Sequence, residues 1–274
     1  MSRLKKLQPF VLLLLLCFFV SACTTVAGTG RSQLNLVNDS ELNQAASLQY
    51  SQLIKESHLS SDRTKTRMIR RVGDRISRAA KQFMEAEGRG AEIANYKWEF
   101  NLIDSDEVNA FCMPGGKVAF YTGILPICQD EAGVAAVMGH EVAHALAKHG
   151  NERVSQQMMT SLGANLLGIG LSIGGTSALT SDLVMTAFSV GSTYGVLLPF
   201  SRSHESEADR IGMSLMAMAG YNPQAAVDLW QRMDAQETGS GRPFFMSTHP
   251  SNKQRIKNLQ SYMPEAEARF QPQK

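Results

Sequence analysis

The stretch Met138-Gly139-His140-Glu141-Val142-Ala143-His144 decides the fold, because it places two histidines four residues apart within a helical pattern. That pattern spans 130–150 and ends on a glycine, which suits a helix terminus. Residues four apart differ by about 40° around a helix, so we expect both imidazoles to point at one spot. This geometry suits two ligands of one zinc ion, with Glu141 beside them to take a proton from metal-bound water.

A catalytic zinc needs a third protein ligand, and the residues just beyond this motif do not supply one. His149 lies about 140° around the helix from the second histidine, so we expect it to face the C-terminal helix dipole. A second helical segment, 203–220, carries Glu205 and Asp209 on one face. One of these carboxylates can bind the metal while the other accepts the free N–H of a ligating histidine. Glu207, about 160° from Glu205, is expected to face elsewhere.

The rest of the chain predicts further helices and a small sheet. Helical patterns cover 62–84, 130–150, 203–220 and 223–236, and one more helix is expected after Pro250. Strands are expected at 96–103 and 117–122, with a turn at Gly115-Gly116 between them. The predicted fold class is therefore α+β and mainly α-helical, with the small sheet before the helix that carries His140.

Composition excludes several classes of protein. The 274 residues are 43% hydrophobic and 19% charged, which excludes disordered and collagen-like chains. Lys and Arg number 27 against 25 Asp and Glu, and a net charge of +2 is too balanced for a dedicated nucleic-acid binder. We therefore expect one folded domain over 41–274.

The first forty residues predict an export signal followed by an anchor. A basic start precedes the apolar run Phe10–Val20, which is too short to span a hydrocarbon core of about 30 Å and is typical of a signal peptide over 1–22. The sequence Val20-Ser21-Ala22-Cys23 resembles the bacterial lipoprotein signal, so we expect lipid on Cys23 and membrane attachment through it. Residues 23–40 would form a polar tether, and Thr24 favours the outer membrane, facing the periplasm.

Two regions leave alternatives open. Cys112 and Cys128 remain after export, and an oxidising compartment permits a disulfide between them, although two separate thiols fit equally well. The stretch 154–201 has one charged residue and is long enough for a membrane hairpin. Its many Gly, Ser and Thr residues favour buried or site-covering helices instead.

Taken together, these motifs resemble metallopeptidase family forty-eight, the gluzincins of the HtpX, BepA and CAAX prenyl endopeptidase type. The resemblance covers about 67–259. Its residues are Asn109-Ala110-Phe111, Pro114-Gly115-Gly116, Thr122-Gly123, the 138–144 motif, Glu205 to Gly212, and Ser247-Thr248-His249-Pro250 with Arg255. It implies a thermolysin-like metallopeptidase core that holds one Zn²⁺ per chain.

The resemblance also implies a role for each residue at the site. Zinc would be bound by His140, His144 and Glu205, with Glu141 as the catalytic base. Asp209 would support one of the histidine ligands.

Three further roles concern the cleft. His249 would either occupy the fourth zinc position as a gate or donate a hydrogen bond to the oxyanion, with Arg255 as a charged helper. The strand at 117–121 would offer its edge to an extended substrate, the β-addition mode. Its substrate-binding residues would be Lys117, Val118, Ala119 and Phe120.

These expectations combine into a lipid-anchored zinc metalloendopeptidase of the bacterial envelope that cleaves misfolded or unassembled envelope proteins. The alternative is a chaperone or assembly factor of the outer membrane with a gated or mainly structural zinc site. Glu141 argues against pure structure, because a structural zinc has no use for a base. An integral membrane protease is a third possibility that depends on 154–201. We expect no nucleic-acid partner, and the sequence does not predict the oligomeric state.

Overall fold

The computed structural model of the protein describes residues 23–168, 201–236, 244–249 and 253–272. The expected signal peptide over 1–22 and the greater part of 154–201 lie outside these residues. Within the described residues, no helix has both the length and the apolar character needed to cross a membrane.

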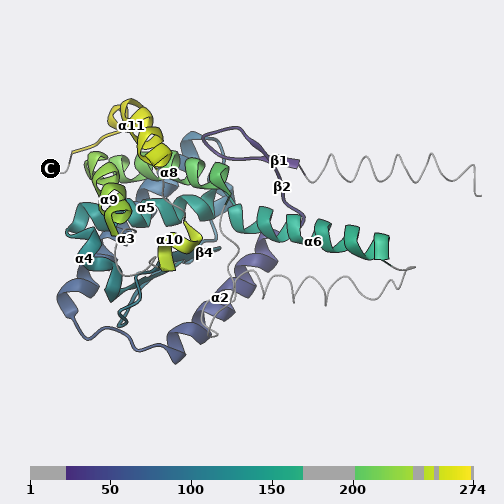
Figure 1. Ribbon diagram of the computed structural model, residues 1–274, viewed down its shortest axis with the longest axis horizontal. Coiled ribbons are helices and arrows are strands. Elements are labelled where there is room, and N and C mark those ends of the chain that lie inside the picture. The colour runs from purple at the N-terminus through teal and green to yellow at the C-terminus, as the bar shows by residue number, and fades with distance from the viewer. Residues whose placement is uncertain (1–22, 169–200, 237–243, 250–252, 273–274) are drawn as a thin grey trace, which may run out of the picture.

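Helix α5 (Glu131–Leu146) lies at the centre of the fold, where other elements surround it (Figure 1). It packs against α3 (Arg63–Ala86), α8 (Arg202–Met218) and α9 (Gln224–Gln236). Helix α11 (Lys253–Ala268) lies on α8 and α9. Short elements complete this side: η1 (Gly90–Ile93), η2 (Thr122–Ile124), α4 (Leu125–Cys128) and α10 (Phe244–Thr248). The surroundings of α5 explain why small residues dominate its sequence.

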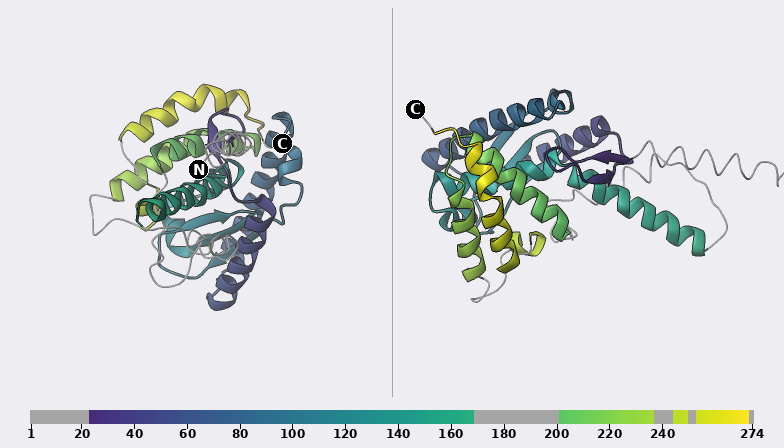
Figure 2. Two further views of the ribbon diagram at one scale, coloured as in Figure 1. Left: turned by 90° about the vertical axis from the view of Figure 1, so that its right-hand side faces the viewer. Right: turned by 90° about the horizontal axis from the view of Figure 1, so that it is seen from above.

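The three-stranded sheet lies between two helical layers (Figure 2). Alternate residues of its strands, such as Phe100, Val118 and Phe120, join the core formed with α3 and α5. The residues between them, such as Ala119 and Tyr121, pack against α2 (Asp39–Glu56). Both faces of the sheet are therefore buried, and the predicted mainly α-helical α+β fold is confirmed.

The order of the strands corrects one prediction. The sheet runs β3 (Glu99–Ile103), β5 (Lys117–Tyr121), β4 (Ala110–Met113), with β5 parallel to β3 and antiparallel to β4. The predicted substrate strand, with Lys117, Val118, Ala119 and Phe120, is thus the central strand, and it pairs with a neighbour on both sides. It has no edge to offer a peptide. The edge strand beside α5 is β4.

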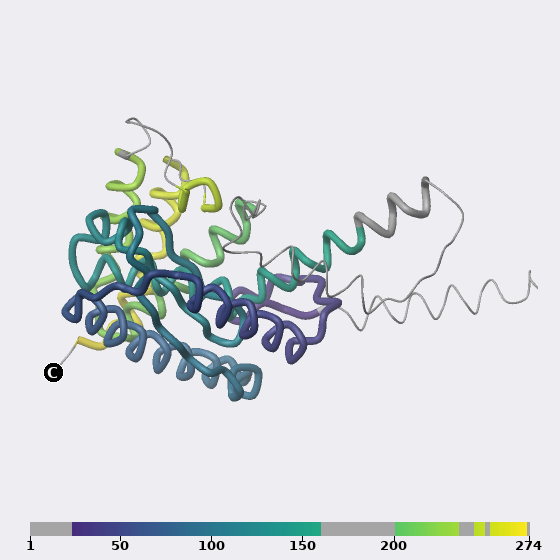
Figure 3. Tube along the Cα trace, turned by 90° about the horizontal axis from the view of Figure 1, so that it is seen from below, coloured from purple at the N-terminus to yellow at the C-terminus, as the bar shows by residue number. Residues whose placement is uncertain are grey.

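The helix predicted over 130–150 is in fact two helices. Helix α5 ends at Leu146, Lys148 adopts a left-handed backbone conformation with φ of 57°, and α6 (His149–Gly168) begins at the next residue. Lys148 is held in this unusual conformation by ion pairs of 2.6 Å with both Asp39 and Glu92. The break sends α6 away from the body of the molecule (Figure 3).

The predicted tether over 23–40 is also different in the structure. Strands β1 (Cys23–Thr25) and β2 (Ser32–Leu34) form an antiparallel hairpin, and α2 begins at Asp39. Val26 and Ala27 are buried in the main core. The hairpin is therefore part of the folded body, fixed by contacts distant in sequence that a polar composition does not reveal.

Helices α5 and α8 cross at two glycines, which sets the geometry of the candidate site. A Cβ on Gly139 would lie 2.7 Å from the carbonyl oxygen of Gly212, and a Cβ on Gly212 would lie 2.8 Å from the backbone nitrogen of His140. Both distances are shorter than van der Waals contact, and the neighbouring atoms belong to the backbone. Glycine at both positions lets the two helices approach closely enough for their polar side chains to meet.

Gly212→Ala should therefore force the helices apart. We expect the free energy of unfolding to fall by about 1–3 kcal/mol, the usual cost of overpacking a core. Chemical denaturation of the metal-free protein measures this loss. The matched control is Arg210→Ala on the same helix, which removes a half-exposed ion pair with Glu265 and should cost less than about 1 kcal/mol. Equal stability of Gly212→Ala and the wild type would contradict close packing at this crossing.

Candidate metal centre

Three polar side chains lie in the buried part of α5, where most neighbouring residues are apolar. His140, Glu141 and His144 are each 3–4% exposed, among Ala, Val and Met side chains that are fully buried. Burying such groups costs free energy unless they find partners or bind a metal. The side chains that meet them come from α8 and from the segment after α10.

The donor atoms of four residues form one compact cluster of buried side chains: His140, His144, Glu205 and His249. His140 Nε2 lies 3.0 Å from His144 Nε2 and 3.2 Å from His249 Nδ1. Glu205 Oε1 lies 3.4 Å from His144 Nε2 and 3.0 Å from His249 Nδ1.

These separations fit one metal ion. Four ligands at tetrahedral positions about 2.0–2.1 Å from zinc are about 3.3 Å apart, close to the observed 3.0–3.5 Å. Two imidazoles and a carboxylate are a donor set that proteins use for catalytic zinc. The residues present therefore fit the zinc ion expected from the sequence.

A buried ion-pair network contacts the clustered donors on the side away from the pocket. Asp209 Oδ1 lies 2.9 Å from His140 Nδ1, which leaves Nε2 of that ring for the metal. Arg255 donates two hydrogen bonds of 2.8 Å to Asp209 and contacts Glu205 Oε2 at 2.6 Å. Burial alone would raise the pKa of Glu205, but His249 and Arg255 hold it well below its usual value. Glu205 is thus kept ionised, as a metal ligand must be.

The position of Arg255 corrects the sequence-based expectation that it helps stabilise an oxyanion. Its guanidinium faces both carboxylates and stacks on the Trp230 ring at 3.3 Å from the centroid. It is not among the residues that line the pocket next to Glu141. Arg255 therefore positions Glu205 and Asp209 rather than the substrate.

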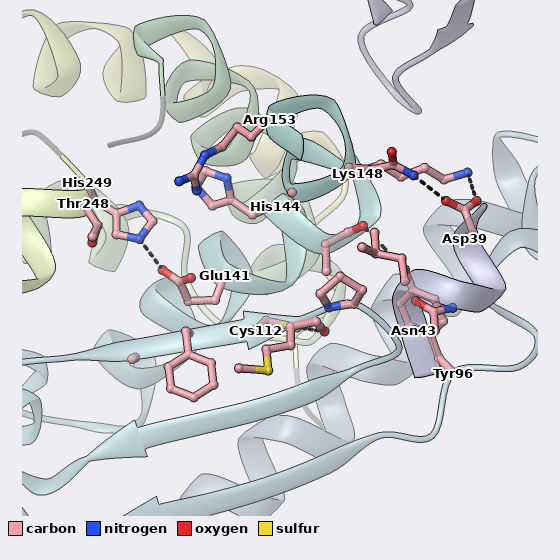
Figure 4. Close-up of a pocket in the computed structure, with 18 of the residues that line it drawn as sticks. Asp39, Asn43, Tyr96, Cys112, Glu141, His144, Lys148, Arg153, Thr248 and His249 are labelled. Carbon is pink, nitrogen blue, oxygen red and sulfur yellow. Dashed lines mark hydrogen bonds and ion pairs between the residues drawn. The ribbon is translucent and has the colours of Figure 1, made fainter. Parts of the chain in front are cut away.

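Glu141 and His249 face each other across the pocket (Figure 4). Glu141 Oε1 lies 3.5 Å from His249 Nε2, while the other ring nitrogen of His249 belongs to the donor cluster. Burial raises the pKa of Glu141 to about 7. Its carboxylate is not one of the clustered donors and lies at the wall of the pocket beside them.

The pocket extends from Glu141 along β4. Its lining includes Phe111 and Cys112 of this strand, together with Lys148 at the break before α6 and Arg153 of α6. Figure 4 shows Arg153 and His144 among the residues that line this pocket. Neither basic residue was singled out from the sequence, because both reach the pocket only through the break between α5 and α6.

Cys112 and Cys128 are free thiols, which settles the open question of a disulfide between them.

His149 does not face the helix dipole as expected. It is the first residue of α6, is fully buried, and its Nδ1 lies 2.9 Å from His144 Nδ1. Its Nε2 lies 3.3 Å from Glu207, which is outside the donor cluster, as its angle of about 160° from Glu205 predicts. Burial lowers the pKa of His149 to about 4, so the ring is neutral. This contact depends on the backbone turn at Lys148. Lys148 carries no obvious turn signal, so the sequence alone does not predict the contact.

Comparison with known proteins places this site in a family. The model of peptidase family M48 matches residues 69–263, which include every residue of the donor cluster. The chain belongs to peptidase family M48. The resemblance drawn from the motifs is thereby confirmed, and zinc as the cofactor agrees with both the family and the donor set.

Several M48 relatives align over much of the chain. The mitochondrial metalloendopeptidase OMA1 of Schizosaccharomyces pombe is 40% identical over 71% of this chain and 54% of its own length. The corresponding protein of Bos taurus is 28% identical over 93% of this chain and 48% of its own length. The β-barrel assembly-enhancing protease of Escherichia coli is 30% identical over 58% of this chain and 33% of its own length. The chain thus spans about half the length of the first two relatives.

These relatives correct two expectations. The predicted location, a bacterial outer membrane facing the periplasm, is wrong, because the relatives that align over 71% and 93% of the chain are mitochondrial enzymes of eukaryotes. The predicted role in cleaving misfolded envelope proteins, and the alternative of an outer-membrane assembly factor, are overturned by the same finding. The M48 motifs are shared by proteins of different compartments, so they could not support a location.

Proposed function

We propose that this protein is a zinc metalloendopeptidase that hydrolyses internal peptide bonds of extended polypeptide segments. The observation that carries the proposal is the buried cluster of His140, His144 and Glu205, with the carboxylate of Glu141 beside it at the wall of a pocket. Relatives named metalloendopeptidases support the reaction class. Because the chain spans about half of their length, its substrates are proposed from the pocket itself.

Each residue at the site has a separate task. His140, His144 and Glu205 would hold zinc, which would supply a Lewis acid that makes water more acidic and polarises the scissile carbonyl. Glu141 accepts the proton at its carboxylate and passes it to the leaving amine. Asp209 and Arg255 keep His140 and Glu205 oriented throughout, so that little reorganisation is needed during reaction.

The substrate is proposed to lie along β4. This strand pairs with β5 on one side, and its residues Ala110 to Met113 line the pocket next to Glu141. An extended peptide can add to such an edge through main-chain hydrogen bonds, which recognise backbone more than side chains. Unfolded polypeptide is therefore the proposed substrate class.

His249 is proposed to act as a gate. Its Nδ1 lies within the donor cluster, where it would occupy the fourth position and keep a reacting water out. His249→Ala should raise the rate of cleavage of an unfolded polypeptide, or cause self-cleavage, while zinc stays bound. Steady-state kinetics with zinc analysis measures both. A fall in kcat of about 10²–10³ would assign oxyanion stabilisation instead, and activity within twofold of the wild type would leave only a packing role.

A reconstitution experiment tests the proposed function. The purified full chain is incubated with casein as an unfolded substrate, then treated with a zinc chelator and resupplied with zinc. We expect internal cleavages by mass spectrometry, loss of cleavage with the chelator and recovery with one zinc per chain. A protein that binds zinc yet never cleaves would contradict the proposal. Removal of 1–22 and lipidation of Cys23 remain separate proposals.

A further inference from the structure

The metal ligand His144 is supported by a second pair of histidines on the side away from the pocket. Its Nε2 belongs to the donor cluster, so its Nδ1 carries the proton that is shared with His149 Nδ1 at 2.9 Å. His149 must then hold its own proton on Nε2, which faces Glu207 Oε2 at 3.3 Å. The ring of His204 stacks on His149 with centroids 4.4 Å apart, and His204 Nε2 contacts Glu152 at 3.0 Å. The orientation of His144 therefore depends on two carboxylates.

These two carboxylates share one cation, Arg31. Glu207 and Glu152 are 8% and 5% exposed, and a buried carboxylate is costly unless a charged partner satisfies it. Arg31 Nε lies 2.6 Å from Glu207, and its two terminal nitrogens lie 2.9 and 2.7 Å from Glu152. Thr29 donates a further hydrogen bond of 2.5 Å to Glu207. A planar fork of donors is well suited to bridging two fixed carboxylates.

Arg31 and Thr29 belong to the N-terminal hairpin, 23–34, which lies outside the residues matched by the family model. The hairpin also has anchors that do not involve Arg31. Val26 and Ala27 are buried in the main core, and Arg89 donates a hydrogen bond of 2.5 Å to the carbonyl of Thr25. A change at Arg31 can thus disturb the carboxylates while the hairpin stays attached.

We propose that the N-terminal hairpin is a working part of the metal centre: Arg31 and Thr29 fix Glu207, Glu207 fixes His149, and His149 orients the imidazole of His144. This inference rests on the proposed zinc site. It makes Arg31 a positioning residue, more than a hundred residues away in sequence from the ligand whose geometry it sets. Its consequence is that the retention of zinc depends on a segment that precedes the family domain.

The variant Arg31→Gln in the full chain tests the inference. Zinc affinity is measured by competition with a chromophoric chelator, and we expect it to fall about 10–100-fold, the usual effect of losing an outer partner of a metal ligand. Cobalt bound in place of zinc should show altered visible absorption bands, which report the ligand geometry directly. Arg31→Lys should recover part of both properties, because lysine supplies the charge but not the fork.

Glu87→Ala is the matched control, because it removes the hydrogen bond that Glu87 accepts from Gly28 N–H of the same hairpin without touching Glu207 or Glu152. We expect its zinc affinity within twofold of the wild type and its cobalt bands unchanged. Wild-type affinity and absorption bands in Arg31→Gln would overturn the inference, as would an equal loss in Glu87→Ala. Circular dichroism of each metal-free variant confirms that the fold persists. A wild-type chain that binds no zinc would instead overturn the proposed function, so the two failures are distinct.

Discussion

Replacing Glu141 with Gln should lower kcat for peptide cleavage by about 10²–10⁴ while one zinc ion stays bound to each chain. Glutamine has nearly the same shape as glutamate but cannot accept a proton, and Glu141 is not among the clustered donors. Zinc content is measured by elemental analysis of the purified variant. The value of kcat is measured by steady-state kinetics with an unfolded polypeptide as the substrate.

Glu131→Gln is the control for this experiment. Glu131 begins the same helix, but its carboxylate pairs with Arg71 on the outer side of the fold. We expect unchanged zinc content and kcat in that variant. Cleavage by Glu141→Gln at more than a tenth of the wild-type rate would contradict the role of Glu141 as the base.

Glu205→Ala should remove zinc from the protein or weaken its binding by more than about 100-fold, beyond what the loss of an outer partner costs. The change deletes one of the three ligands and leaves Arg255 with Asp209 as its remaining carboxylate partner at the site. Zinc affinity by chelator competition and peptide cleavage should fall together.

Glu265→Ala is the comparison for this second prediction, because Glu265 pairs with Arg210 of the same helix α8, away from the cluster. It should bind zinc as the wild type does. Full zinc content and activity in Glu205→Ala would show that the third ligand is another residue. The same result would mean that the ion pair between Arg255 and Glu205 does not serve to orient a metal ligand.

The chemical core of the site could be predicted because its residues follow helical spacing. His140 and His144 are one turn apart on α5, and Glu205 and Asp209 are one turn apart on α8, so each pair shares a face. The crossing of the two helices depends on Gly139 and Gly212, which allow the backbones to approach closely. The sequence alone does not predict that these two glycines meet.

What the sequence could not reveal depends on contacts distant along the chain. The role of His149 depends on the backbone turn at Lys148, which the ion pairs with Asp39 and Glu92 hold in place. The sequence does not predict that β5 is the central strand, because a hydrophobic strand can pair on one side or on both sides. In the structure β5 pairs with β3 and with β4. The polar composition of 23–34 predicts a tether, because the residues that form ion pairs with this hairpin are more than a hundred residues away in the sequence.

Zinc K-edge X-ray absorption on the wild-type protein, compared with Glu205→Ala, tests the proposed zinc site most directly. We predict nitrogen and oxygen ligands at about 2.0–2.1 Å with at least two imidazoles in the wild type, and loss of bound zinc in the variant. A shell of sulfur at about 2.3 Å would place Cys112, which lines the same pocket, at the metal and contradict the proposed ligands. An unchanged spectrum in Glu205→Ala would contradict them equally.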